Sequence, residues 1–310
     1  MIKNNRIVII GAGAVGCSYA YALLQQGLTG EIVLIDVNEE KAAGEAGDLR
    51  DAVPFAPVPV TIRSGGYEDC SEAELVVITA GLAQKPGETR LDLLTKNADI
   101  FERIVTEVMA HGFNGIFLAA TNPVDILTDI TQQVSGLPAE RVIGSGTVLD
   151  SARLQSVVSA CFHIDSRDVH AWIIGEHGDT SLPVWSSAFA GMKDIRTMAA
   201  EEGQQLDSIF QRVQSAAYEI IQQKGATHFG IGMSLARITR AIVHDENAVL
   251  PVSARLNGEY GENGIYIGVP AVIGRTGIRS VMDLPLDETE TQQFAHSAQT
   301  LRESKQTLSY

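Results

Sequence analysis

The sequence predicts an α/β protein, with a doubly wound parallel sheet followed by a second, mixed α+β domain. In the first half of the 310 residues, short β-branched runs alternate with helical patterns. Most of these runs are apolar throughout, as strands buried on both faces of a parallel sheet require. The second half groups its helices ahead of its strands, which favours an α+β arrangement.

The elements of the first half follow a strand–helix–strand order, which implies right-handed crossovers. Apolar runs predict strands at residues 6–10, 31–36, 60–63, 75–79, 115–121 and 141–143. Helical periodicity predicts helices at residues 14–26, 39–52 and about 88–110.

The pattern changes near residues 144–146, so we place a first domain at residues 1–144 and a second at 145–310. In the second domain we expect helices at 148–161, 205–224 and 231–244, and a closing helix from Asp287. Strands are expected at 169–174, 248–256 and 265–273.

Composition and net charge limit the kinds of molecule that this chain could bind. The formal net charge of −15 argues against nucleic acid, because most of the surface would repel a phosphate backbone. A small anionic substrate stays compatible, since a few arginines in a cleft create a local positive field. No apolar stretch is long enough to cross a membrane. The three cysteines, Cys17, Cys70 and Cys161, lack metal-ligand spacing, which indicates free thiols in a reducing cytoplasm and no metal site.

A glycine-rich turn joins the first predicted strand to the first helix at residues 11–16. Gly11 permits a tight turn, Gly13 lets a pyrophosphate approach the backbone, and Gly16 lets the helix pack closely on the sheet. Asp36 ends the second strand about 20 residues later, where a carboxylate binds ribose hydroxyls and repels a 2′-phosphate. The pattern predicts a Rossmann domain that binds NAD rather than NADP; the alternative is a glycine turn in an unrelated sheet protein.

Residues 175–179 (GEHGD) place His177 at the end of the predicted strand 169–174. An imidazole there lies in a cleft near its titration midpoint at neutral pH, as a proton donor and acceptor must. The alternative is a structural histidine satisfied by hydrogen bonds.

Asp150 and Arg153 begin the next helix, three positions apart on one face. The functional interpretation makes Asp150 the group that orients His177 and Arg153 a planar fork for a substrate carboxylate. The alternative is a surface ion pair of small energetic value.

Two further segments follow strand ends, where ligands bind in open α/β sheets. Residues 81–90 contain Pro-Gly and polar residues that suit a lid, and Arg90 would enter the site when such a lid closes. Asn122 ends the fifth strand, within hydrogen-bonding reach of a cofactor carboxamide and a substrate oxygen. Each segment also has an ordinary interpretation as loop or cap chemistry.

An ordered set of motifs runs nearly end to end: GAGAVG at 11–16, LID at 34–36, AQKPGETRLDLL at 83–94, ATNPVDILT at 120–128, VIGSGTVLDSAR at 142–153, GEHGD at 175–179 and KGAT at 224–227. Through these motifs the chain resembles the L-lactate dehydrogenases of the lactate/malate dehydrogenase superfamily. The resemblance implies a homotetramer that uses NAD to interconvert pyruvate and L-lactate.

The resemblance also implies a role for each matching residue. His177 is implied as acid/base with Asp150 as its partner, Arg153 as the carboxylate clamp and Arg90 as the group that polarises the carbonyl. Asn122 and Thr227 are implied to line the pocket. The residues implied to hold the cofactor are Gly11, Gly13, Gly16 and Asp36, with Asn122, Thr79, Gly81, Asn97 and Ile231 as weaker candidates.

One departure from the family pattern, one agreement with it and two alternatives remain. Bacterial relatives that fructose bisphosphate activates carry an arginine and a histidine at the positions of Gln155 and His170, so we expect weak or absent activation. Small residues in the helix at 39–52 (Ala42, Ala43, Gly44, Ala46 and Gly47) allow another surface to approach, in agreement with the family's tetramers. A malate dehydrogenase and an NAD-binding protein without catalysis are the alternatives, and bulkier 2-oxo acids stay open as substrates.

Gln84 decides between pyruvate and oxaloacetate. Malate enzymes of the superfamily carry an arginine here, because a second substrate carboxylate must be neutralised in a dry pocket. We therefore predict that Gln84→Arg raises kcat/KM for oxaloacetate relative to pyruvate, measured as the rate of NADH consumption with each acid. An unchanged ratio would contradict this role for Gln84.

Overall fold

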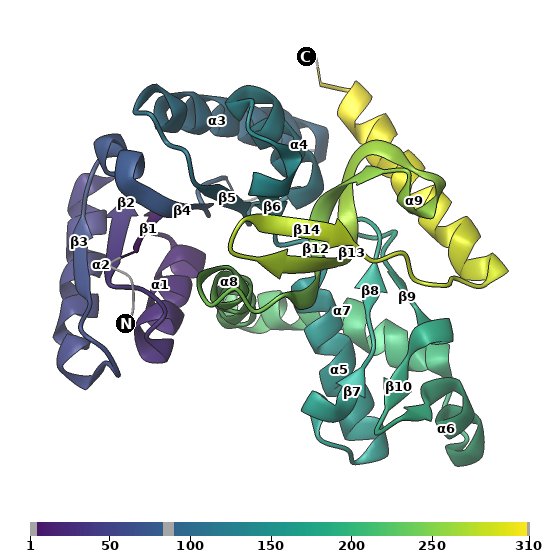
Figure 1. The fold of residues 1–310 in the computed structure, drawn as a ribbon. Coiled ribbons are helices and arrows are strands. Elements are labelled where there is room, and N and C mark those ends of the chain that lie inside the picture. Colours follow the sequence, from purple (N-terminus) through teal and green to yellow (C-terminus); the bar gives the residue numbers. More distant parts are fainter. Residues whose placement is uncertain (1–4, 83–89, 309–310) are drawn as a thin grey trace.

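In a computed structural model, the described residues are 5–82 and 90–308, with the backbone alone described for residues 90–92. Figure 1 shows a central sheet with α3 and α4 on one side and α1 and α8 on the other. The helices are α1 (Ala14–Gln26), α2 (Glu39–Asp51), α3 (Arg90–Ala110), α4 (Val124–Ser135), α5 (Val148–Phe162), α6 (Ile195–Glu202), α7 (Leu206–Lys224), α8 (Phe229–Val243) and α9 (Glu288–Gln306).

The described strands form one large sheet and two small ones. The large sheet has the order β14-β13-β12-β6-β5-β4-β1-β2-β3. Its members are β1 (Arg6–Ile10), β2 (Glu31–Ile35), β3 (Thr61–Ser64), β4 (Ala73–Ile78), β5 (Ile116–Ala119), β6 (Val142–Gly144), β12 (Ala248–Asn257), β13 (Asn263–Gly274) and β14 (Gly277–Val281). The small sheets contain β7 (Val169–His170), β8 (Ile173–Ile174), β9 (Leu182–Pro183), β10 (Phe189–Ala190) and β11 (Lys193–Asp194).

The predicted fold class is confirmed. Strands β1 to β6 pair in parallel, and all but the first residue of β1 and β2 are buried. The chain turns back between β1 and β4, where the order of the parallel strands reverses. Ligands bind in open α/β sheets at such a reversal, outside the carboxyl ends of the strands.

The second half adds strands to the same sheet. Strand β12 pairs antiparallel with β6 through Ser253 and Gly144, and β13 and β14 extend the sheet further. A second apolar core lies under α5, α6 and α7, around Leu154, Trp185 and Ile209. The two halves therefore share one sheet, while the second half also has a core of its own.

The predicted single strand at residues 169–174 was wrong. Its two ends belong to different sheets, since β7 pairs with β10 and β8 pairs with β9. His170 is exposed, so the segment is not buried along its length as its apolar composition suggests. Helices α4 and α6 and strand β14 were not predicted. The start of α4 lies within the motif at residues 120–128, which we interpreted only as the end of the fifth strand.

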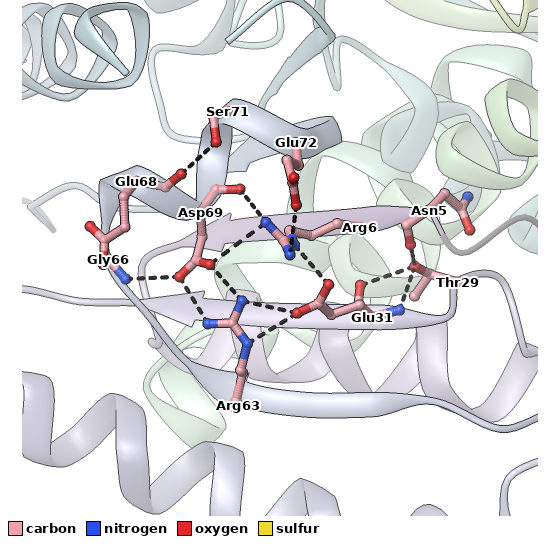
Figure 2. A network of polar contacts seen from close by, with 10 residues as sticks. All are labelled: Asn5, Arg6, Thr29, Glu31, Arg63, Gly66, Glu68, Asp69, Ser71 and Glu72. Carbon is pink, nitrogen blue, oxygen red and sulfur yellow. Dashed lines mark hydrogen bonds and ion pairs between the residues drawn. The ribbon is translucent and has the colours of Figure 1, made fainter. Parts of the chain in front are cut away.

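Charged side chains join the amino ends of β1 and β2 to Arg63 of β3 and to Asp69, in the turn before β4 (Figure 2). Arg6 contacts Glu31 at 2.7 Å, and Arg63 contacts Asp69 at 2.5 Å and Glu31 at 2.9 Å. Hydrogen bonds from Arg63 hold the pKa of the Asp69 carboxyl below its usual value despite partial burial. The network lies on the side of the sheet away from the carboxyl ends of the strands, where ligands bind in such sheets. It therefore stabilises the sheet and takes no part in ligand binding.

We predict that Asp69→Asn lowers the free energy of unfolding by about 1–2 kcal/mol, because hydrogen bonds between charged groups are lost in a largely buried site. The depressed pKa means that this contribution is present at neutral pH and disappears as pH falls through the folded-state value. Thermal unfolding midpoints at pH 7 and pH 3 measure it. Glu201→Gln is the matched control, because it breaks an exposed pair with Lys193 and is expected to change little. Equal effects of the two variants would contradict the prediction.

Candidate active site

One carboxylate joins the two charged side chains that the sequence singled out. Asp150 Oδ2 lies 2.6 Å from His177 Nδ1, and Asp150 Oδ1 accepts a hydrogen bond from Arg153 Nη1 at 3.2 Å. All three side chains are largely buried, with exposed fractions of 15% for Asp150, 16% for Arg153 and 23% for His177. The structure thus brings together His177, Asp150 and Arg153.

Backbone and hydroxyl contacts fix the segment that carries His177. Ser151, next to Asp150, accepts a hydrogen bond from the Ile173 amide at 2.8 Å, which ties α5 to β8. Gly175 exchanges two backbone hydrogen bonds with Gly268 of β13, at 2.9 and 3.0 Å. The Glu176 amide donates to Ser297 Oγ of α9 at 2.7 Å. These contacts leave the imidazole little freedom to move away from Asp150.

Asp150 keeps the imidazole charged. Burial disfavours the imidazolium, but the charge and hydrogen bond of Asp150 outweigh it and raise the pKa of His177 to about 9. The same pairing lowers the pKa of Asp150 despite its burial. A protonated imidazole and an ionised carboxylate are therefore the resting state at neutral pH, with Nε2 free of this hydrogen bond and available to a substrate oxygen.

The glycine turn forms a cradle between β1 and α1. Gly11 has φ of 110°, a conformation that favours glycine. A Cβ at Gly16 would lie 2.0 Å from Gly11 O, whereas a Cβ at Gly13 would meet nothing within 4 Å. Gly16 is thus required by packing, and Gly13 leaves open space at the amino end of α1. This space and the free amides of the helix terminus fit a pyrophosphate.

Asp36 and Thr79 hold this turn in place. The Asp36 carboxylate accepts hydrogen bonds from the Ala12 amide at 2.8 Å and the Asn38 amide at 2.9 Å. It is only partly buried, which leaves lone pairs for ribose hydroxyls. Thr79 Oγ1 donates to Gly11 O at 2.8 Å. The residues predicted to bind NAD therefore lie around the strand reversal between β1 and β4.

The buried side chain of Asn97 hydrogen-bonds two backbone segments near the carboxyl ends of β4 and β5. Its side chain is fully buried, accepts from the Leu82 amide at 2.8 Å and donates to Asn122 O at 3.0 Å. Asn97 therefore joins the backbone that follows β4 to the backbone that follows β5. Gly81 packs against Thr121, and a Cβ there would lie 2.3 Å from Thr121 Cγ2. Asn122 itself is exposed at the carboxyl end of β5.

Thr227 lies in the corner between α7 and α8, and Ile231 lies in the first turn of α8. A Cβ at Gly230 would lie 2.8 Å from Leu149 Cδ1, so the start of α8 packs on the start of α5. His228 lies 3.0 Å from Ser18 Oγ of α1 and 2.9 Å from Lys224 Nζ. The contact between His228 and Ser18 joins the corner between α7 and α8 to α1, the helix that begins at the glycine turn.

Some predicted residues lie outside what the structure describes. Gln84 is among them, and for Arg90 only the backbone is described, as the first residue of α3. Gln155 and His170 lie away from this cluster: Gln155 Nε2 donates to Ala171 O at 3.5 Å, and His170 is exposed in β7.

Sequence reasoning missed the residues that hold His177 from behind. Gly268 and Ser297 gave no signal, since their contacts depend on how β13 and α9 pack. Asp125 lies within the motif at 120–128 but received no role; its carboxylate accepts a hydrogen bond from the His177 amide at 2.9 Å.

Three further observations on the described residues concern membrane spans, metal ligands and thiols. No helix among them is long and apolar enough to span a membrane. Within the same ranges, His, Cys, Asp and Glu side chains form no group of three or more suited to a metal ion. Burial raises the pKa of Cys17 and Cys70 to about 12, so these thiols are poor nucleophiles at neutral pH.

Two family models match the chain. The model described as lactate/malate dehydrogenase, NAD binding domain, matches residues 5–144. The model described as lactate/malate dehydrogenase, alpha/beta C-terminal domain, matches residues 147–309.

Individual relatives match over almost the whole chain. Proteins named L-lactate dehydrogenase 2 from Bacillus cereus and Bacillus anthracis are 58% identical over 304 residues, covering 97% of each chain. A lactate dehydrogenase from a Medee basin deep-sea metagenome library has a TM-score of 0.96 at 48% identity, covering 99% of both chains. The minor L-lactate dehydrogenase of Enterococcus mundtii in its ligands-bound form also has a TM-score of 0.96 at 48% identity, covering 98% of both chains.

Substitutions of two glycines in the cradle distinguish an effect on folding from an effect on NADH binding. We predict that Gly13→Ala leaves the thermal unfolding midpoint unchanged but weakens NADH binding, because the new methyl group occupies the space predicted for a pyrophosphate. Gly16→Ala is expected to weaken binding and also to destabilise the fold by about 1–3 kcal/mol, because it overpacks the turn. NADH titrations and thermal unfolding of both variants measure this. Unchanged NADH affinity of Gly13→Ala would contradict the assignment of the cradle.

Proposed function

This chain belongs to the lactate/malate dehydrogenase family, and we propose that its Asp150–His177–Arg153 cluster reduces pyruvate and oxidises L-lactate. The enzyme is an NAD-dependent L-lactate dehydrogenase, as its relatives and its two matched domains indicate. The observation that carries the residue assignment is the single carboxylate shared by an imidazole and a guanidinium. We also propose that residues 1–144 bind NAD and that residues 145–310 supply the acid/base pair.

His177 moves the proton. In pyruvate reduction the imidazolium donates from Nε2 to the carbonyl oxygen, and in lactate oxidation the neutral ring accepts the hydroxyl proton. Asp150 stabilises the imidazolium before transfer and holds the ring by Nδ1 throughout. Bound NAD, held by Gly11, Gly13, Gly16 and Asp36, supplies or accepts the hydride.

Arginines bind and polarise the substrate. Among the described residues Arg153 pairs with Asp150 through Nη1, and its remaining guanidinium N–H groups bind the substrate carboxylate as a planar fork. We assign Arg90 to the carbonyl oxygen, where negative charge increases in the transition state more than in the bound substrate. Asn122 and Thr227 complete the pocket wall, and Gln84 leaves a second substrate carboxylate without a cation.

We propose a homotetramer. Large apolar side chains are exposed on α1, α7 and α8, where a second copy would cover them: Tyr21, Tyr218, Ile221, Phe229 and Met233. The small residues of α2 support this only in part. Ala42 and Ala46 are buried within their own chain, so packing explains them, whereas Ala43 and Gly44 are exposed.

Further proposals concern allosteric activation, cellular location and metabolic role. We propose weak or absent activation by fructose bisphosphate, since Gln155 offers a neutral amide where a guanidinium would bind phosphate. We also propose a cytoplasmic enzyme of fermentation and glycolysis, without nucleic-acid or membrane partners.

The proposed function is tested at His177. We predict that His177→Asn lowers kcat for pyruvate reduction by at least ~100-fold, because a positioned acid/base group contributes on that scale. In the wild type, pyruvate reduction should be steady near neutral pH and fall as pH rises through about 9, where the imidazolium loses its proton. Lactate oxidation should rise over the same range. Steady-state rates from pH 6 to pH 10 measure both. Near-normal turnover of the variant would refute the assignment.

A further inference from the structure

His228 lies in the corner between α7 and α8, and its ring is directed at α1. It is the residue directly before α8, and its neighbour on the other side is Thr227, a predicted part of the pocket wall. Helices usually begin at a short polar residue whose side chain caps the free amides. Among the described residues, the imidazole of His228 makes no such cap. Its orientation toward α1 therefore requires another explanation.

The two ring nitrogens of His228 have different partners. Nε2 lies 2.9 Å from the Nζ of Lys224, the last residue of α7, and Nδ1 lies 3.0 Å from Ser18 Oγ of α1. A lysine ammonium can only donate hydrogen bonds, so Nε2 accepts and Nδ1 carries the proton of the ring. Nδ1 then donates to the Ser18 hydroxyl. The ring thus joins the end of α7 to α1 in one defined tautomer.

Helices α1 and α8 come from opposite halves of the chain and lie side by side (Figure 1). One turn after His228, a Cβ at Gly232 would lie 3.0 Å from Ser18 Cβ and from Tyr19 N. Further along the two helices, the buried hydroxyl oxygens of Tyr19 and Thr239 lie 2.6 Å apart. The body of α8 is therefore held against α1 by close packing and by a buried hydrogen bond.

The corner before α8 is more exposed than the body of the helix. In the single chain residues 218–226 are exposed, and Thr227 and His228 are only partly buried. Ser18 lies one helical turn after Ala14, the first residue of α1. The contact from His228 to Ser18 thus fixes this corner relative to the helix that begins at the cofactor cradle. Loss of the contact would release Thr227 and leave the body of α8 in place.

We propose that His228 is a positioning residue for pyruvate binding, which places Thr227 in the pocket by joining the corner before α8 to α1. The inference rests on the proposed function, in which Thr227 forms part of the pocket wall. The acid/base group His177 lies on a segment that β13 and α9 hold separately. Removal of the His228 contact therefore weakens pyruvate binding and leaves proton transfer intact.

The first test is His228→Ala, which removes both contacts of the ring. We expect the KM for pyruvate at saturating NADH to rise about threefold to tenfold, the factor that one neutral hydrogen bond contributes. The value of kcat should stay within about twofold, because only binding of the substrate is affected. Oxamate, an unreactive analogue of pyruvate, should bind the enzyme–NADH complex more weakly by the same factor, measured through NADH fluorescence. A purely structural role would lower the thermal unfolding midpoint and kcat without changing KM.

A double-mutant cycle tests whether Ser18 is the partner that matters. Ser18→Ala removes the acceptor and should raise the KM for pyruvate as much as His228→Ala does. The double variant should be no worse than either single variant, because both substitutions remove the same interaction. Gln26→Ala is the matched control, since Gln26 at the carboxyl end of α1 also contacts α8, at Met233 Sδ, but away from the cradle. It should leave KM unchanged.

A wild-type KM in His228→Ala overturns the proposal, as do effects of the two substitutions that multiply in the double variant. If His228→Ala does not fold or assemble, the KM of Ser18→Ala decides by the same criterion. Wild-type enzyme is assayed alongside with pyruvate and NADH. If it does not consume NADH, the proposed function fails; if it does, the result at His228 concerns this inference alone.

Discussion

The active site depends on how one carboxylate divides its two oxygens. Asp150 gives one oxygen to His177 and the other to Arg153, so the groups that we propose for proton transfer and for substrate binding share a single anchor. A charged imidazole in a largely buried position is costly on its own, and the carboxylate offsets that cost. Moving Asp150 by a small distance would therefore disturb both functions at once. Placing this anchor on a helix rather than on a loop gives it the rigidity that the geometry requires.

The fold supplies that rigidity by joining distant parts of the chain. Helix α5 begins where β6 ends, and Thr147 and Ser151 of this region bind Ile173 of β8. Close backbone approach between Gly175 and Gly268 then fixes the segment before His177 to β13. Strand β13 belongs to the same sheet as the glycine turn after β1. Cofactor cradle and acid/base pair are thus attached to one continuous sheet, although they come from opposite halves of the chain.

Much of this arrangement was accessible from the sequence. Apolar runs and the glycine turn predicted the parallel strands, because burial on both faces and a tight strand–helix turn leave clear local patterns. The spacing of Asp150 and Arg153 predicted their shared helix face. The split between β7 and β8, the extension of the sheet by β12 to β14, and the buried contact from Asp125 to His177 were not predicted. Each of these depends on which distant backbone lies alongside, and a single sequence carries no local signal for such pairings.

Asp150 sets the protonation state of the His177 ring, and NMR of protein labelled with ¹⁵N at histidine measures that state directly. The ring nitrogens of His177, assigned by loss of their signals in a His177 variant, are followed from pH 5 to pH 10. We predict that the imidazole stays protonated through neutral pH and titrates near 9. Titration at or below its ordinary value near 6.5 would show that Asp150 does not hold the proton on the ring.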